Sequence, residues 1–583
     1  MVAAVPRSGT PETSSAPPSD APAPSLAAGT RLSPAARRPL AGAAVVLAVV
    51  LLFVAYLQVS RTYPENSDES NDLLMAWDML HGNGLLHGWY LSDVSFITTE
   101  LPQYALLVLL FGLHTNTAHI AAAMTYTLVV VLAVLLARGA APGRDGWPRM
   151  LLTAGIMFAP QLGVAVFVLM LSLGHIGTAV PIMATWLVLD RLKPRWPAPV
   201  IVGLMLTWAL VADPLVLVAG VVPLVAVCAV RVIRAVAAGG RQSGWLPASI
   251  PARVAAQWYE ISLAAAAIVA EGLASLAGRL IKASGGFILH PVPYQLAPVH
   301  TWPKHAYVTA QGLLALFGAR PQGPAIELAF ALVHLAGIAL AAWAMWRVAR
   351  HFISCPDMIS QILLLAIVIN VVAYVPSTLA DATDLNAREF AVVLPFGAVL
   401  AGRMLAAGWA ARARDARARD ARARDARARD ARGRPRWRTW LAAVVVAAYA
   451  ASLGYAAAQP AIPAANTTLA RFLVAHHLTE GIGGYWESSV VTVGSGGAVT
   501  VRAVLPGTLT PDLWESKGSW YDPRAHRATF LVTDSASGFF NHWQPAPAAL
   551  AALGRPARTY HVGTYTVYVW NKNLLVRVSQ AAR

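Results

Sequence analysis

Long apolar runs separated by short basic loops make up most of the chain. A helix needs about 20 mostly apolar residues to cross the hydrocarbon core of a bilayer, and the run Leu40–Val59 has that length without a charged residue. Fitting further apolar runs between the basic loops predicts about eleven spans in all. The predicted spans are residues 40–59, 118–138, 150–170, 174–191, 199–212, 214–231, 254–281, 324–347, 359–379, 388–405 and 437–457.

Two stretches allow more than one arrangement. Residues 200–230 hold either two short spans broken at Asp213-Pro214 or one long span. Leu101–Leu113 is also apolar, but a full span there would move the next basic loop to the outer side. We therefore expect Leu101–Leu113 to be a half-inserted helix at the outer surface.

The positions of Lys and Arg predict the orientation in the membrane, because basic loops stay in the cytoplasm. The loops expected there are residues 138–149, 191–195, 231–253, 347–350 and 403–438. The N-terminus is then cytoplasmic, and three polar stretches lie outside: residues 60–100, 283–323 and 458–583. The run Leu40–Val59 is too long for a signal-peptide core, so we expect a retained anchor.

Composition agrees with this organisation. Of 583 residues, 57% are hydrophobic and 13% charged, and the mean hydropathy is +0.53, which excludes an ordinary soluble protein. Half of the net charge of +16 comes from residues 412–438, so the charge does not indicate nucleic-acid binding. The two cysteines, Cys228 and Cys355, adjoin predicted cytoplasmic ends and indicate neither a disulfide framework nor a thiolate metal site.

Three domains are expected. Residues 1–38 are rich in Pro, Ala and Ser and should form a disordered cytoplasmic N-terminus. Residues 39–457 should form the transmembrane domain, which includes an ARARD repeat at residues 411–434. That repeat places charge on every side of a helix, so we expect a solvated cytoplasmic linker, with contact to anionic lipid as the alternative.

The third domain, residues 458–583, has the composition of a small extracytoplasmic α/β domain. A helix is predicted around Asn466–His477. The alternating or β-branched runs that predict strands are Ser489–Val493, Ala498–Leu505, Ala528–Thr533, Thr564–Trp570 and Leu574–Val578.

The outer loop 60–100 concentrates acidic residues next to the membrane. No Lys or Arg occurs between Glu65 and Tyr104. An adjacent acidic pair such as Asp68-Glu69 is most often part of an ordinary solvated loop. Here the pair precedes the sequence Leu101-Pro102-Gln103-Tyr104, an apolar helix ending at Phe111-Gly112, and a full span.

This order of features resembles the GT-C superfamily of membrane glycosyltransferases, in particular the protein O-mannosyltransferase and aminoarabinose-transferase-like branch (glycosyltransferase family 39-like). Asp68-Glu69 match the family's Asp-Glu, and Leu101-Pro102-Gln103-Tyr104 matches its Pro-Pro-Leu-Tyr segment with one proline replaced. The Arg that usually opens the next span is absent, and Ala118-His119 stand there. Residues 388–396 resemble the family's Arg-aromatic and Leu-Pro segment.

The resemblance implies a polytopic α-helical membrane protein of GT-C-like fold that transfers a sugar from a polyprenyl-phosphate donor to an extracytoplasmic lipid, glycan or protein. It implies that Asp68, with Glu69 beside it, takes the proton of the acceptor. The leaving phosphate needs cations at the outer face. The cationic candidates are Lys304, His305, Arg320 and, most favoured, Arg388.

Asp93, Glu100 and Tyr104 are the remaining substrate-binding candidates. No metal ligands are assigned, although Asp93, Glu100 and Glu69 could together bind Mg²⁺ or Mn²⁺, which prefer oxygen ligands. Two other classes of protein stay open. One is a transporter or lipid flippase, which should carry more ionisable residues inside its spans; the other is a catalytically inactive scaffold of the same fold. The Ala-, Arg- and Pro-rich composition suggests a bacterial plasma membrane.

Overall fold

The computed structural model describes residues 34–581 except for 141–145, 161, 171–174, 243–249, 291, 293–294, 381–383, 405–436 and 537–541. The ARARD repeat at 411–434, and the predicted disordered N-terminus as far as residue 33, therefore lie outside the described residues. The chain divides into two units, residues 1–50 and 51–583. All contacts discussed below lie within the second unit.

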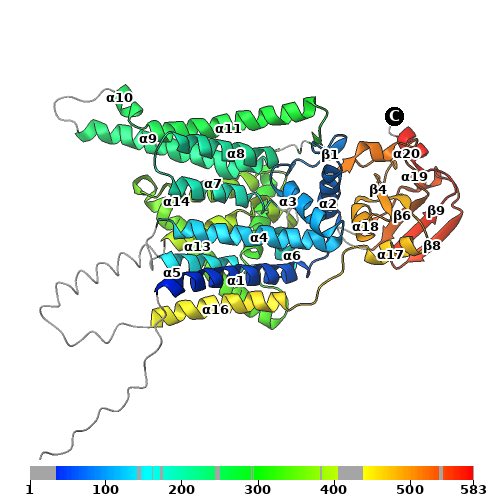
Figure 1. The fold of residues 1–583 in the computed structure, drawn as a ribbon, viewed down its shortest axis with the longest axis horizontal. Helices are drawn as coiled ribbons and strands as arrows, with labels where there is room; N and C mark the ends of the chain where they lie inside the picture. Colours follow the sequence, from blue (N-terminus) through cyan, green and yellow to red (C-terminus); the bar gives the residue numbers. More distant parts are fainter. Residues whose placement is uncertain are drawn as a thin grey trace, which may run out of the picture. The chain divides into compact units, whose positions relative to one another are not determined.

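Apolar helices account for most of the described residues and confirm a multi-pass membrane protein. Five are long and apolar enough to cross a membrane: Gly42–Ser60 within α1 (Pro34–Ser60), α4 (Thr115–Arg138), Leu217–Ala238 across η2 and α9 (Leu217–Val221 and Val222–Gln242), α11 (Trp258–Ala283) and α13 (Ala325–Arg350). Shorter apolar helices are α3 (Glu100–Phe111), α8 (Pro197–Ala212), α14 (Met358–Tyr374), Val393–Met404 and Val444–Ala457 within α16 (Trp437–Ala457). The long helices α4, α8, α9, α11, α13 and α16 run side by side (Figure 1).

One predicted span, residues 150–170, is broken in the structure. α5 (Trp147–Met157) ends before Pro160, and α6 (Val164–Met170) begins after Gly163, whose φ is +80°. Proline cannot donate the next helical hydrogen bond. At the end of α5, the Met157 carbonyl accepts hydrogen bonds from the hydroxyls of Tyr56 at 3.3 Å and Tyr126 at 3.0 Å.

Small residues let the helices approach closely, as expected where lipid removes the hydrophobic driving force between helices. On α11 the buried residues Leu263, Ala267, Ala270 and Ala274 form one stripe. A Cβ added at Gly203 of α8 would lie 3.2 Å from the Cβ of Ala266. The opposite face of α11 exposes large apolar side chains to the surroundings of the bundle, which are lipid in the membrane.

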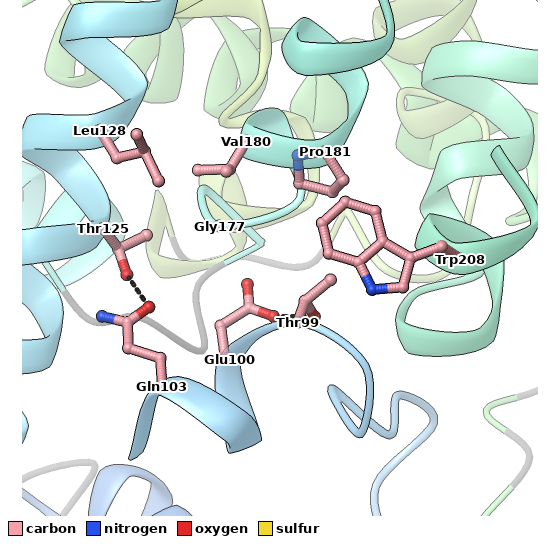
Figure 2. A pocket seen from close by; sticks show the side chains of 9 residues that line it. All are labelled: Thr99, Glu100, Gln103, Thr125, Leu128, Gly177, Val180, Pro181 and Trp208. Carbon is pink, nitrogen blue, oxygen red and sulfur yellow. Dashed lines mark hydrogen bonds between the residues drawn. The ribbon is translucent and has the colours of Figure 1, made fainter. Parts of the chain in front are cut away.

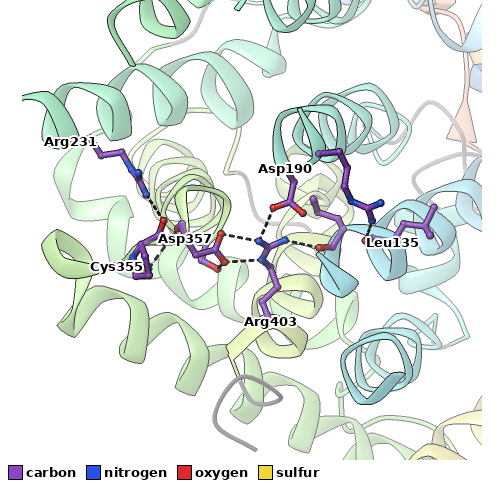
Figure 3. A network of polar contacts seen from close by, with 10 residues as sticks. Leu135, Asp190, Arg231, Cys355, Asp357 and Arg403 are labelled. Atoms are coloured by element: carbon purple, nitrogen blue, oxygen red, sulfur yellow. Dashed lines mark hydrogen bonds and ion pairs between the residues drawn. The ribbon is translucent and has the colours of Figure 1, made fainter. Parts of the chain in front are cut away.

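A buried arginine ties together one end of the bundle (Figure 3). Arg403 donates from Nε and Nη2 to the carboxylate of Asp357 at 2.8 Å, from Nη2 to Asp190 at 2.9 Å, and from Nη1 to the Leu136 carbonyl at 2.7 Å. Arg231 donates to the Pro356 carbonyl at 2.9 Å. The ends of α4, α7 (Ala179–Arg191) and helix 393–404 and the middle of α9 therefore meet the start of α14. Each of these places adjoins a basic loop that the sequence placed on the cytoplasmic side.

The other end of the bundle carries the polar stretches that the sequence placed outside. Loop 60–100 contains α2 (Ser67–Leu80) and β1 (Trp89–Leu91), and loop 283–323 contains β2 (Ile288–Leu289) and α12 (Trp302–Leu316). β1 pairs in parallel with β2 and antiparallel with β5 (Ser516–Lys517), so that Tyr90 lies between Ile288 and Ser516. One small sheet thus joins all three outer stretches. The sequence analysis predicted neither α2 nor α12.

The C-terminal domain is built on a mixed sheet in the order β4-β3-β6-β9-β8, with β7 also paired to β6. Its strands are β3 (Glu480–Gly483), β4 (Thr500–Ala503), β6 (Phe530–Ser535), β7 (His542–Trp543), β8 (Arg558–Val562) and β9 (Tyr565–Val569). The helices are α17 (Thr467–Ala475), α18 (Ser489–Gly494), α19 (Pro547–Ala551) and α20 (Leu575–Ala581). The small α/β class is confirmed, as is the helix expected around Asn466–His477.

Two predicted strands of this domain are wrong. Residues 489–493 form α18, whose valines are buried and whose Ser489 hydroxyl donates to Asn71 of α2. Residues 574–578 belong to α20, where the Asn573 side chain accepts from the Leu575 amide at 3.1 Å and so caps the first turn. In both cases packing or capping outweighs the β preference of the valines.

We expect Arg403→Met to destabilise the membrane domain strongly. The change leaves the carboxylates of Asp357 and Asp190 without their cation, and breaking a buried charge pair costs about 3–5 kcal/mol. Thermal unfolding of the detergent-solubilised protein measures this cost. Arg350→Met, at the exposed end of α13, is the matched control and should change stability by no more than about 0.5 kcal/mol. Equal losses in the two variants would contradict the role given to Arg403.

Candidate active site

The first turn of α2 places the adjacent acids Asp68 and Glu69 in different environments. The Asn66 side chain accepts from the amide of Asp68 at 2.9 Å, and Glu69 Oε2 accepts from the amide of Asn66 at 3.0 Å. These reciprocal bonds form a capping box. Glu69 is therefore buried against the backbone, while the side chain of Asp68 projects from the helix toward the C-terminal domain.

Asp68 contacts one cation and one hydroxyl. Its Oδ2 lies 3.8 Å from Nη1 of Arg388, in η5 (Asp384–Phe390), and its Oδ1 accepts from the Tyr485 hydroxyl at 2.8 Å. Burial raises the pKa of Asp68, and Arg388 and the Tyr485 hydrogen bond oppose that rise. The cation and the hydroxyl thus favour the carboxylate form, which is the form a base needs.

The C-terminal domain supplies two polar groups at this point. Tyr485 lies in η6 (Tyr485–Glu487), and Glu515 immediately precedes β5. The Tyr485 hydroxyl oxygen is 2.7 Å from Glu515 Oε2. The amide nitrogen of Asn71, on α2, donates to both at 3.1 and 3.2 Å.

These side chains line a cavity of about 250 Å³. Three candidates from the sequence, Asp68, Asp93 and Arg388, share its wall. The structure adds residues that the sequence analysis did not select. They are Ser92, Val94, Phe96, Phe167, His175, Leu385, Asn386, Tyr485, Trp486, Trp514 and Glu515.

A second charged network adjoins the same wall. His175 Nδ1 lies 2.9 Å from Asp213 Oδ2, and His175 Nε2 lies 3.7 Å from Glu389 Oε2. Glu389 Oε1 is in turn 3.8 Å from Nε of Arg388. Asp213, which the sequence analysis names only at a possible break between two short spans, is therefore an ion-pair partner that is almost fully buried.

Arg388 keeps unused hydrogen-bonding capacity. Its two ion-pair distances to described residues, Asp68 and Glu389, are both 3.8 Å, longer than a hydrogen bond. Its Nε is buried and makes no hydrogen bond to any described residue. A guanidinium held in this way can still donate to an anion that enters the cavity.

The other candidates lie elsewhere. Glu100 lines a separate cavity of about 180 Å³ with Thr99, Gln103 and Trp208, and its carboxyl group points toward Gly177 (Figure 2). A Cβ at Gly177 would lie 1.8 Å from Glu100 Oε1, so only glycine leaves room for this carboxyl group. Tyr104 is fully buried in α3.

The basic candidates of α12 do not line the Asp68 cavity. Lys304 is exposed, and the buried His305 has its Nδ1 3.0 Å from the Val375 carbonyl oxygen. Glu69, the second member of the acidic pair, is also absent from the cavity wall. Within the part of the chain that the structure describes, no group of three or more His, Cys, Asp or Glu side chains is arranged to hold a metal ion.

A salt bridge beside the cavity holds the C-terminal domain against α2. Lys517 Nζ donates to both oxygens of Asp78 at 3.0 and 2.9 Å, and the Trp89 indole donates to Asp78 at 2.7 Å. These bonds lower the pKa of Asp78 although burial opposes them. Sequence reasoning missed Tyr485 and Glu515 because they lie 417 and more residues from Asp68 and belong to no local motif.

No protein-family model and no curated protein matches the sequence. Among solved structures, the chain is similar to ArnT from Cupriavidus metallidurans bound to undecaprenyl phosphate, with a TM-score of 0.50, 12% identity, and coverage of 90% of this chain and 98% of that one. It is also similar to the oligosaccharyltransferase of Archaeoglobus fulgidus in complex with Zn and sulfate, with a TM-score of 0.42, 11% identity, and coverage of 83% and 68%. The likeness to ArnT confirms the GT-C-like fold.

We expect Glu69→Ala to loosen the start of α2, because it removes the acceptor for the Asn66 amide. Loss of such a cap costs about 1 kcal/mol. Glu69→Gln keeps an oxygen at the same place and should cost less. Amide hydrogen exchange over residues 64–72 is the measurement, and faster exchange in the alanine variant than in the glutamine variant is expected. Equal exchange in wild type and both variants would show that Glu69 does not cap the helix.

Proposed function

We propose that this protein is an integral membrane glycosyltransferase that moves a sugar from a polyprenyl-phosphate donor to an extracytoplasmic acceptor. The observation that carries the proposal is the placement of Asp68 and Arg388 together in the wall of one cavity, 3.8 Å apart. Such a transfer needs both a base for the acceptor and a cation for the leaving phosphate.

The reaction is a displacement at the anomeric carbon of the sugar. The hydroxyl oxygen of the acceptor forms a bond to that carbon while the bond from carbon to the phosphate oxygen breaks, and the electron pair leaves with the phosphate. The proton of the acceptor hydroxyl passes to Asp68. Oδ2 is the atom suited to receive it, because Oδ1 already accepts from Tyr485.

Arg388 is proposed to hold the phosphate of the donor. Its buried Nε has no hydrogen-bond partner among the described residues, and a guanidinium binds phosphate oxygens through two parallel N–H groups. Burial lowers the pKa of Arg388, but the surrounding carboxylates, Asp68 first, outweigh burial and raise it. The group therefore stays charged as the leaving phosphate gains negative charge.

Asp93 is the third sequence candidate in the wall and is proposed to bind hydroxyl groups of a substrate. The aromatic side chains of Trp486 and Trp514 add apolar surface to a cavity whose wall otherwise carries many polar and charged groups. We assign no phosphate-binding role to Lys304 or His305. For Glu100 and Tyr104 we propose only a structural role, in the packing of α3 against the other helices.

The site is proposed to face the outside of a bacterial plasma membrane. The cavity lies between α2, η5 and the C-terminal domain. The basic helix ends around Arg403 meet at a different place in the bundle. If those basic ends are cytoplasmic, then the N-terminus is cytoplasmic, the C-terminal domain is extracytoplasmic, and the lipid-linked donor reaches the site from the outer leaflet.

We expect Asp68→Asn to reduce glycosyl transfer about 10²–10⁴-fold, the usual contribution of a general base. The measurement is transfer of radiolabel from a panel of polyprenyl-phosphate sugars in membranes that contain wild type or variant protein. Glu69→Gln is the matched control, because it alters the neighbouring acid outside the cavity and should lose far less. Transfer unaffected by Asp68→Asn would contradict the assignment of the base.

We expect Arg388→Gln to weaken donor binding and to change the pH profile. Loss of a hydrogen-bonded charge costs about 1.5–3 kcal/mol, or roughly 10–150-fold in the KM for the donor. The guanidinium also holds down the pKa of Asp68, so its removal raises that pKa and moves the acidic limb of kcat/KM to higher pH. Arg388→Lys should fall between wild type and Arg388→Gln. An unchanged donor KM and pH profile would contradict this role.

A further inference from the structure

We infer that Tyr485 and Glu515 of the C-terminal domain are positioning residues for Asp68, and that they act as a hydrogen-bonded chain in which protonated Glu515 donates to Tyr485 and Tyr485 donates to Asp68. This inference rests on the proposed function only for its effect on catalysis. The hydrogen-bonded chain itself depends only on which of the two carboxyl groups, Glu515 or Asp68, holds one proton. With this hydrogen-bonded chain, the C-terminal domain contributes two residues to the site.

The count of hydrogens supports the chain. The Tyr485 hydroxyl oxygen lies 2.8 Å from Asp68 Oδ1 and 2.7 Å from Glu515 Oε2, and it has only one hydrogen to donate. Two ionised carboxylates cannot both be satisfied by that hydrogen. One of the two carboxyl groups must therefore carry a proton and donate it to the tyrosine oxygen.

Asn71 completes the arrangement. Its side-chain nitrogen donates to the Tyr485 oxygen at 3.1 Å and to Glu515 Oε2 at 3.2 Å. The tyrosine oxygen then donates one hydrogen bond and accepts two, which uses its full capacity. The Asn71 oxygen accepts from Ser489 of α18, so the donor direction of the amide is fixed by the same domain.

The charges around the two carboxyl groups decide which one holds the proton. Arg388 faces Asp68 directly, at 3.8 Å. Glu515 instead faces the charge of Asp68, and Arg388 interacts with Glu515 less than with Asp68. The negative charge is therefore more stable on Asp68, and the proton on Glu515.

The pKa directions agree with this placement. Burial, and then the charge of Asp68, raise the pKa of Glu515 to about 7, although its hydrogen bonds with Tyr485, Asn71 and Ser92 oppose the rise. Burial and the two carboxylates raise the pKa of Tyr485, so the phenol keeps its hydrogen. Burial also raises the pKa of Asp72 well above its ordinary value, and this side chain is fully buried without a hydrogen-bond partner among the described residues.

The chain gives Asp68 a fixed orientation. With Oδ1 held by Tyr485, Oδ2 stays on the side of Arg388, where the reacting hydroxyl and the leaving phosphate are proposed to meet. Above about pH 7 Glu515 loses its proton. Tyr485 must then divide its single hydrogen between two carboxylates, and Asp68 is no longer held in one orientation.

The test is the pH profile of kcat in wild type and Glu515→Gln. If only the protonated form is active, wild-type kcat should fall about tenfold per pH unit above about pH 7. Glutamine donates through its amide at every pH, so Glu515→Gln should keep kcat within a few-fold of wild type at pH 6 and should not show the alkaline decline. Tyr485→Phe should lower kcat about 10–100-fold with little change in the donor KM.

Lys517→Gln is the matched control, two residues further along the same segment. It removes the salt bridge to Asp78 and loosens the same domain junction outside the cavity. It should leave the alkaline limb in place. A loss of the limb in Lys517→Gln as well, or a kcat of Glu515→Gln more than about 100-fold below wild type at all pH values in folded protein, would overturn the inference.

Infrared difference spectroscopy tests the proton without any transfer reaction. Wild type minus Glu515→Gln at pH 6 should show the carbonyl stretch of one protonated carboxylic acid, and this band should disappear with a midpoint near pH 7. Absence of the band would overturn the chain whatever the enzyme assay shows. If the band is present but no donor supports transfer in wild type, the chain stands and the proposed function fails.

Discussion

The partly buried carboxylate of Asp68 is the constraint on which the end of the protein that carries the C-terminal domain depends. A carboxylate removed from water tends to take up a proton, and a protonated acid cannot serve as a base. Two partners from distant parts of the chain favour the charged form of Asp68 against the effect of burial: Arg388 in η5 and Tyr485 in the C-terminal domain. The site is therefore complete only where α2, the membrane domain and the C-terminal domain meet.

The rest of the outer architecture brings these three parts into register. The capping box at Asn66 fixes the direction of Asp68. The strands β2, β1 and β5 tie loop 283–323, loop 60–100 and the C-terminal domain into one sheet. Lys517 extends from this sheet to Asp78 at the far end of α2. Arg403 holds the basic helix ends together in a similar way. Its guanidinium joins the carboxylates of Asp357 and Asp190 and the carbonyl of Leu136.

Patterns along the chain were sufficient for the membrane helices and for part of the site. The ends of α4, α8 and α11 fall within a few residues of the predicted spans, because length and hydropathy are local properties. Asp68 could be selected because Asp68-Glu69 match the family's Asp-Glu pair after a predicted span, and Arg388 because it lies at the mouth of another predicted span. The break at Pro160 was missed, since the apolar run continues through it, and α2 was missed because its polar residues face partners that the sequence does not reveal.

The contribution of the C-terminal domain could not be predicted in this way. Tyr485 and Glu515 belong to no sequence motif. They join the site only because folding places them next to Asp68, more than 400 residues away in the sequence. The helical state of residues 489–493 has the same cause, because α18 buries its valines and joins Asn71 through Ser489. Local β preference suggested a strand there, and long-range packing decided otherwise.

The most direct measurement is a structure of the protein in lipid nanodiscs with a polyprenyl phosphate bound, determined by electron cryomicroscopy. We expect the phosphate inside the cavity lined by Asp68, Asp93 and Arg388, with its oxygens within hydrogen-bond distance of the Arg388 guanidinium. We also expect the hydrocarbon chain to leave the cavity toward the lipid. A phosphate bound instead beside Lys304 and His305, with the Asp68 cavity empty, would contradict the account.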